Sequence, residues 1–288
     1  MDNNEINALI KLLDDPDLNV FQAIRNKLSQ QNVDVIPYLE KAWENSLDEL
    51  FQTRIEDIIQ EIHQSHIKKR LQKWNESSHQ DLLEGATIIS QFQYPDIKPQ
   101  SIIEQVEEIK KDIWLEINEN LTALEKIKIV NHIFFDIYKY SRSKVSYNNT
   151  QGFFINHVLN TKKGSPITLG IIYASICQQL DIPVYGVALP KNFILCYKDK
   201  MQPAFDEEFA EGILFYINPF NKGVVFGKKE IELFIKQQKL EDKKAYFQPC
   251  NNKDTIIHLV NDIIAFYENN ADKTKADEYR LLLKILYF

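Results

Sequence analysis

Cysteine is scarce in this sequence of 288 residues. The three cysteines, Cys177, Cys196 and Cys250, are far apart, odd in number and without a CxxC pair. This usage excludes a disulfide framework and a zinc knuckle, and it is typical of a protein that works in a reducing compartment. We therefore expect a cytoplasmic protein with no cofactor and no metal.

Glycine is also rare, with eight residues and neither a GxGxxG nor a P-loop sequence, so two common routes to nucleotide binding are unsupported. His63 and His66 are the only close histidine pair, and no third ligand lies nearby. We interpret them as surface residues rather than as a metal site. The acidic segment 205–212 contains no histidine, and we interpret it as a solvated loop.

Long hydrophobic runs are absent, since none approaches the roughly 18–20 residues that cross a bilayer. The first residues, MDNNEINALIKLLDDPD, show no basic region followed by an apolar segment, so we expect no signal peptide. Acidic residues outnumber basic ones by 41 to 34, and the short basic run at 68–70 reads as a solvated helix face. Because nucleic-acid binding needs clustered positive charge, we expect neither a nucleic acid nor a membrane as partner.

The first half of the chain has the apolar spacing of helices. Apolar residues in 6–13 recur at i, i+3, i+4 and i+7, and DDPD at 14–17 then ends this helix. Asp17 or Asn19 can cap the next one, and helical patterns follow at 20–28, 33–43 and 47–67. Short helices joined by acidic turns resemble a HEAT-like repeat, and an irregular bundle is the alternative. We expect a helical domain over residues 1–92, ended by the linker QYPDIKPQ at 93–100.

The second half mixes helices and strands. We expect helices at 101–118 and 122–140, a polar loop at 140–152 and a helix beginning at Pro166. Segments 182–190, 192–199 and 213–227 are β-rich and bounded by turn residues, and 228–238 returns to helix. A closing helix pair turns near 269–272. The pattern predicts an α+β fold, with a core at 93–245 and a helix pair at 246–288.

The segment KKGSPITLG, at 162–170, predicts a helix start. Gly164 ends a loop, Ser165 is a favourable N-cap and Pro166 suits the first helical position. Helix N-termini favour anions, and many enzymes place a reactive thiolate there. The question is whether this chain holds a nucleophile at that point.

Three short motifs occur in a characteristic order. A Gly-x-Pro helix start is followed by LPKNF at 189–193 and then by INPFNKG at 217–223. In this order they resemble the transglutaminase-like superfamily and its bacterial SirB-type branch, whose stretches read approximately R-G-I-P-I-S-L, L-P-G-H-F and D-P-F-N-x-G. The matching residues are Gly164, Pro166, Ile167, Leu169, Leu189, Pro190, Phe193, Pro219, Phe220, Asn221 and Gly223. The resemblance covers roughly residues 90–240.

The resemblance implies where a catalytic triad would lie. In active members of the superfamily a Cys opens the helix, and the next two strands supply a His and an Asp. The corresponding positions here are Pro166, Asn192 and Asn218. Proline has no nucleophile, and an Asn amide neither titrates usefully nor carries the charge that stabilises an imidazolium. We therefore expect a protein without this triad, a pseudoenzyme.

Two interpretations of the asparagines stay open. Asn192 and Asn218 can be structural descendants of a catalytic pair that hydrogen-bond to each other, or they can simply be exposed turn residues beside prolines.

A relocated nucleophile is the alternative to lost catalysis. Cys196 lies on the same strand face as Asn192, with His157 as a conceivable base, although a Cys in an apolar strand is usually a packed hydrophobe. We interpret Cys177 as a buried residue of the hydrophobic core. Ser165 and Thr168 read as capping residues rather than as hydroxyl nucleophiles.

Three functions follow from these observations. The first is a non-catalytic transglutaminase-like module that binds an unidentified protein or peptide. Its candidate cleft residues are Ser165, Pro166, Asn192, Asn218 and Asn221. The second is a cysteine-dependent hydrolase or acyl transferase using Cys196. The third is a scaffold that binds nothing specific.

Overall fold

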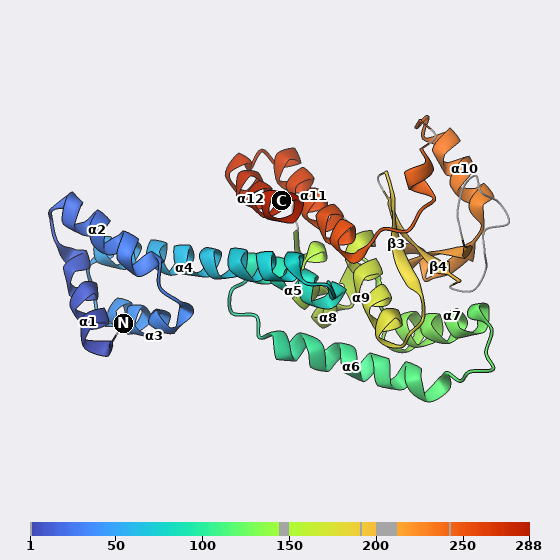
Figure 1. Cartoon of the computed structure of the whole chain (residues 1–288), viewed down its shortest axis with the longest axis horizontal. Coiled ribbons are helices and arrows are strands. Elements are labelled where there is room, and N and C mark those ends of the chain that lie inside the picture. The colour runs from blue at the N-terminus through green and yellow to red at the C-terminus, as the bar shows by residue number, and fades with distance from the viewer. Residues whose placement is uncertain (1, 144–149, 191, 200–211, 242) are drawn as a thin grey trace. The chain divides into compact units, whose positions relative to one another are not determined.

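The computed structural model describes residues 2–143, 150–190, 192–199, 212–241 and 243–288 (Figure 1). The chain divides into two compact units, Met1–Lys73 and Trp74–Phe288. The sequence predicted the first boundary at residue 92 instead. The two boundaries differ because α5 (Leu82–Gln93) belongs to the second unit. It packs there against α8 (Ile155–Thr161), α9 (Pro166–Gln179) and α11 (Asn252–Asn269), and it is buried along most of its length.

The first unit is entirely helical within its described residues. Its elements are α1 (Asn3–Lys11), η1 (Leu12–Asp14), α2 (Leu18–Ser29), η2 (Val33–Val35), α3 (Ile36–Glu44) and the larger part of α4 (Glu49–Glu76). The turn predicted at 14–17 is confirmed, and Asp17 caps α2 by accepting a 2.8 Å hydrogen bond from the Asn19 N–H. The local signals of the sequence therefore placed these helices correctly.

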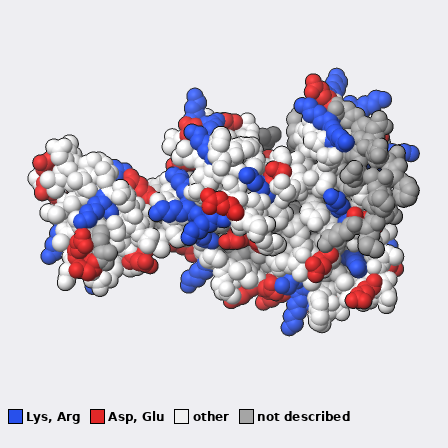
Figure 2. All heavy atoms as spheres, in the orientation of Figure 1, with Lys and Arg blue, Asp and Glu red and all other residues white. Residues whose placement is uncertain are grey.

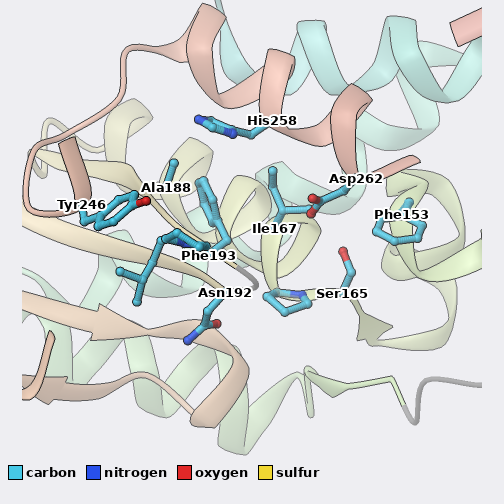
Figure 3. A pocket seen from close by; sticks show the side chains of 12 residues that line it. Phe153, Ser165, Ile167, Ala188, Asn192, Phe193, Tyr246, His258 and Asp262 are labelled. Atoms are coloured by element: carbon cyan, nitrogen blue, oxygen red, sulfur yellow. The ribbon is translucent and has the colours of Figure 1, made fainter. Parts of the chain in front are cut away.

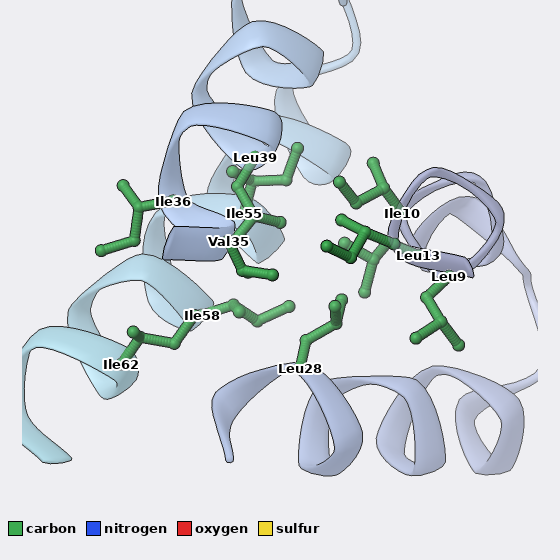
Figure 4. Close-up of a cluster of buried hydrophobic side chains, with 11 residues drawn as sticks. Leu9, Ile10, Leu13, Leu28, Val35, Ile36, Leu39, Ile55, Ile58 and Ile62 are labelled. Carbon is green, nitrogen blue, oxygen red and sulfur yellow. The ribbon is translucent and has the colours of Figure 1, made fainter. Parts of the chain in front are cut away.

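Aliphatic side chains from all four helices form the core of this unit (Figure 4). Leu13, Leu28 and Leu39 are fully buried in it. Burial of apolar area is the main stabilising contribution in such a bundle, because short helices are marginal on their own. Whether the unit is a HEAT-like repeat stays a prediction.

The second unit combines helices with a small sheet. Its longer elements are α5, α6 (Pro99–Glu116), α7 (Ala123–Asn131), η3 (His132–Ile137), α8 (Ile155–Thr161), α9 (Pro166–Gln179), α10 (Lys228–Gln237), α11 (Asn252–Asn269) and α12 (Lys273–Tyr287). The sheet is antiparallel, in the order β3 (Val184–Leu189), β4 (Asn192–Lys198), β5 (Ile213–Asn218) and β6 (Val224–Phe226). The predicted α+β fold and closing helix pair are confirmed.

The unit also contains three short 3-10 helices among its described residues, η4 (Thr150–Phe153), η5 (Pro219–Asn221) and η6 (Lys244–Tyr246). Part of the predicted loop at 140–152 is a strand instead. β1 (Ser141–Arg142) pairs in parallel with β2 (Lys163–Gly164), directly before α9. This pairing anchors the segment that leads into the N-terminus of α9.

Helix α9 packs on one face of the sheet, against β3 and β4, and it is buried along eleven consecutive residues. The Phe193 ring of β4 fits between Gly170 of α9 and Gly186 of β3. A Cβ at Gly170 would lie 2.8 Å from this ring, and one at Gly186 would overlap it. The two glycines therefore let helix and strands close around one aromatic side chain.

The opposite face of the sheet has its own apolar cluster. Cys196 and Tyr216 belong to it, together with Ile231 and Ile235 of α10 and Phe247. Both faces of the sheet are therefore covered, as the continuous apolar pattern of β4 requires.

No helix in the described part of the chain combines the length and the hydrophobicity that crossing a membrane requires. Acidic and basic side chains are interspersed on the face of the molecule that Figure 2 shows.

Candidate functional site

The N-terminus of α9 forms as its sequence predicts. The Ser165 hydroxyl accepts a 3.3 Å hydrogen bond from the Thr168 N–H, and Pro166 occupies the first turn. Ser165 Oγ also lies 3.0 Å from Thr168 Oγ1, which in turn donates to the Phe153 carbonyl at 3.2 Å. The Ser165 hydroxyl thus has the capping role that we expected, and the Thr168 hydroxyl links this cap to the Phe153 carbonyl.

A pocket of about 410 Å³ lies in front of this helix terminus. Ser165 and Pro166 line it from α9, and Asn192 lines it from the start of β4 (Figure 3). The other lining residues are Phe153, Ile167, Ala188, Leu189, Pro190, Phe193, Tyr246, His258 and Asp262. Three of the five predicted cleft residues therefore share one cavity, whose remaining walls are mostly apolar.

The two other predicted cleft residues do not line this pocket. Asn218 ends β5, and its side-chain oxygen accepts hydrogen bonds from the N–H groups of Phe220 (3.0 Å) and Asn221 (3.1 Å). Asn221 is exposed. Among the described residues no hydrogen bond joins Asn192 to Asn218, so the neutral pair considered from the sequence does not form. The side-chain oxygen of Asn218 is used by the turn that follows it.

The thiols are unsuited to nucleophilic attack. Cys196 is fully buried in the cluster between the sheet and α10, and burial raises its thiol pKa to about 12. Cys177 is fully buried too, which raises its pKa further, and burial raises the pKa of Cys250 to about 11. Since the thiolate is the reactive form, these environments favour inert thiols.

The conceivable base His157 has a packing partner of its own. Its ring stands edge-on to Tyr94, with 4.8 Å between the ring centroids. Cys196 lies in the cluster under α10, whose members do not include His157. The relocated Cys196–His157 pair therefore has no support from the geometry.

Two polar residues of the pocket were not recognised in the sequence. His258 and Asp262 lie one turn apart on α11, and both line the pocket from that helix (Figure 3). Their i, i+4 spacing in HLVND, which places two side chains on one helix face, was the only available signal. The neighbouring sequence contains no signal that this helix face lies near the N-terminus of α9.

The pocket changes the acidity of both residues. Burial lowers the pKa of the half-buried His258 imidazole, and the nearby Asp254 carboxylate opposes this effect. Protein atoms crowded around the Asp262 carboxyl raise its pKa to about 6, from a usual 3.8, although the residue keeps an exposed surface. This shift favours the neutral acid of Asp262.

The described residues contain no group of three or more His, Cys, Asp or Glu side chains that could hold a metal ion. The acidic segment at 205–212 lies outside the described residues except for Gly212.

Comparison with known proteins identifies a family and several relatives of this chain. A family model described as "Transglutaminase-like superfamily" matches residues 100–261. Protein SirB1 of Salmonella typhimurium is 25% identical over 161 residues, which are 56% of each chain. A UPF0162 protein of Xylella fastidiosa is 24% identical over 65% of each chain. Human F-box only protein 21 is 23% identical over 65% of this chain and 32% of its own length.

These alignments leave much of each relative unmatched. The matched part of the first relatives ranges from 21% of mouse F-box only protein 21 to 65% of the Xylella protein. No solved structure gives a significant match.

Proposed function

The chain belongs to the transglutaminase-like superfamily, and from this premise we propose that it is a non-catalytic module that binds a protein or peptide in the pocket before α9. In active members of the superfamily that position holds the catalytic Cys, paired with a His from the next strand. We infer that Pro166 and Asn192 occupy these two positions.

The observation that supports the proposal most strongly is that Pro166 and Asn192 line the same pocket. Neither side chain can attack an acyl group or accept a proton at neutral pH. The cavity itself persists, with apolar walls and a few polar groups, which is the usual composition of a ligand site. A retained pocket without its reactive groups is suited to binding without turnover.

The alternative, a hydrolase or acyl transferase that uses Cys196, has less support. Its thiol lies in an apolar cluster on the other face of the sheet from α9, and burial disfavours its thiolate. We also propose a cytoplasmic location, for which the free thiols Cys177, Cys196 and Cys250 are the support.

The test is a selection of random displayed peptides on the full chain, followed by calorimetry with the enriched sequences. Ala188→Trp fills the pocket from β3, and Leu214→Trp introduces the same side chain at an exposed site on β5. We expect the enriched peptides to bind the wild type and Leu214→Trp equally, and Ala188→Trp at least about tenfold more weakly.

Two results would contradict the proposal. One is peptide binding that survives the filled pocket, because the peptide then docks elsewhere. The other is a mass change in peptide recovered from the protein, because this would show turnover. A variant with all three cysteines replaced by Ser separates thiol chemistry from other reactions.

A further inference from the structure

The Asp262 carboxylate has no ion-pair partner among the residues that the structure describes. No Lys, Arg or His of the described residues lies within ion-pair distance of it. The three surface pairs that involve described carboxylates of α11 or α12 use Arg280 and Lys275 instead. Of the described residues that line the pocket, Asp262 is the single acidic one, and none is Lys or Arg. Within the described part of the chain, the pocket therefore has an acidic group without a basic side chain to pair with it.

The walls around Asp262 suit a cation with an apolar neighbour. Phe153, Phe193 and Tyr246 contribute aromatic rings to the same cavity, and Ile167 and Leu189 add aliphatic surface. In Figure 3 the Asp262 carboxylate points from α11 toward Ile167 and the Ser165 hydroxyl. An ammonium group placed there would donate charge-assisted hydrogen bonds to the Asp262 carboxylate while its carbon neighbours contact the rings.

An anionic ligand is less suited to the same cavity. A helix N-terminus attracts anions mainly through its free N–H groups. Pro166 has no N–H, and the Thr168 N–H already donates to Ser165 Oγ. This leaves the Ile167 N–H as the donor among the first three residues of α9, whereas Asp262 would repel an anion.

We propose that Asp262 binds a primary ammonium group of the peptide, with the neighbouring apolar part of the peptide against Phe153 and Ile167. This inference rests on the proposed function and adds the chemical class of the ligand. The ammonium group belongs either to a Lys side chain or to the amino terminus of the bound chain. Both sources share the chemistry that the pocket recognises.

Other titratable groups near the pocket come from two elements. His258 lies on the same helix as Asp262, with Asp254 one turn before it, and Tyr246 reaches the pocket from η6. The test therefore compares variants at one pH, about 7.5, where a carboxyl with either the ordinary or the raised pKa is ionised. The pH is held constant, and only the protein variant and the probe change.

The experiment is an NMR titration of the isotope-labelled full chain with two matched small probes. Phenethylamine carries an ammonium group beside an aromatic ring, and phenethyl alcohol has nearly the same shape without the charge. The backbone amides of Ile167, Phe193 and Asp262 report on the pocket. Asp262→Asn removes the charge there, and Glu268→Gln removes one elsewhere on α11, from the pair with Arg280.

We expect phenethylamine to bind the wild type and Glu268→Gln about fivefold to tenfold more tightly than the alcohol does. In Asp262→Asn the two probes should bind alike. Equal binding of both probes to the wild type, or an amine preference that survives in Asp262→Asn, would overturn the inference while leaving a neutral binding pocket intact. Failure of both probes to shift the pocket amides also overturns it.

Two further probes distinguish the sources of the ammonium group. Nα-acetyl-lysine amide presents a side-chain ammonium, and glycyl-phenylalanine amide presents a chain-terminal one. The probe whose binding falls in Asp262→Asn and not in Glu268→Gln identifies the source. If neither depends on Asp262, the assignment is wrong, even when the displayed peptides of the previous experiment still require an open pocket.

Discussion

Asn131 and Gly223, 92 residues apart in the sequence, form a tight contact between α7 and the turn after η5. The Asn131 amide donates a 2.8 Å hydrogen bond to the Gly223 carbonyl, and its oxygen accepts a 2.9 Å bond from the Tyr173 hydroxyl of α9. Gly223 has a positive φ of 68°, and a Cβ there would overlap the Asn131 amide. This position therefore needs glycine for two independent reasons.

Replacing Gly223 with Ala should lower the stability of the second unit. The left-handed backbone costs about 1 kcal/mol for a residue with a Cβ, and the overlap with Asn131 adds to this cost. We expect a total loss of roughly 2–4 kcal/mol in the free energy of unfolding, measured by urea denaturation.

The double variant Asn131→Ala with Gly223→Ala separates the two causes. In the Asn131→Ala background the overlap is gone, so Gly223→Ala should cost only the backbone part. An unchanged cost in that background would show that the contact with Asn131 does not constrain this turn.

The cysteines should react slowly with iodoacetamide in the folded chain. Burial raises the pKa of Cys196 to about 12 and that of Cys250 to about 11, so the thiolate is a minor species at neutral pH. Mass spectrometry of the labelled peptides should show Cys250 reacting first, because it is the least buried of the three. Rapid and stoichiometric labelling of Cys196 would instead favour the thiol-enzyme alternative.

Asp262→Asn should stabilise the fold at neutral pH. The folded state holds the Asp262 proton more tightly than the unfolded state, with a pKa of about 6 against a usual 3.8. Ionisation therefore costs stability, and this loss develops as the pH rises from about 4 to about 6 and persists above that. Because the residue keeps contact with solvent, we expect at most about 1 kcal/mol.

The check for this effect is the difference in melting temperature between wild type and Asp262→Asn. It should be clear near pH 7.5 and close to zero near pH 4. A difference of the same size at both pH values would mean that the ionisation of Asp262 does not lower the stability of the fold.

Leu28→Ala should destabilise the first unit by about 2–5 kcal/mol, because Leu28 is fully buried in its core. Limited proteolysis with mass spectrometry should then show faster cleavage within residues 1–73. The matched change on the same helix is Leu18→Ala, since Leu18 is 71% exposed, and it should have little effect. Equal acceleration by both variants would exclude this core as the cause.

Local signals predicted much of the fold. The cap at Ser165, the proline at 166 and the strands β3 and β4 depend on neighbouring residues, and the structure has them where the sequence indicated. The pairing of β1 with β2 was missed because each strand has two residues, too few to show a period. The partner of α5 was missed because an apolar helix face does not specify what covers it.

The candidate site was predicted in part for the same reason. Ser165, Pro166 and Asn192 belong to motifs that can be read locally, and they share the pocket. His258 and Asp262 lie more than 60 residues further along, on a helix whose pattern also fits a solvated face. Their role depends on how α11 packs in the second unit, which the spacing of residues alone does not encode.

The fit of Phe193 between Gly170 and Gly186 has an evolutionary consequence. The three positions share one volume, contributed by a helix and two strands, and the ring that fills it also lines the pocket. A larger residue at either glycine position can be accepted only if position 193 becomes smaller. Across relatives we therefore expect these three positions to covary, and the depth of the pocket to change with them.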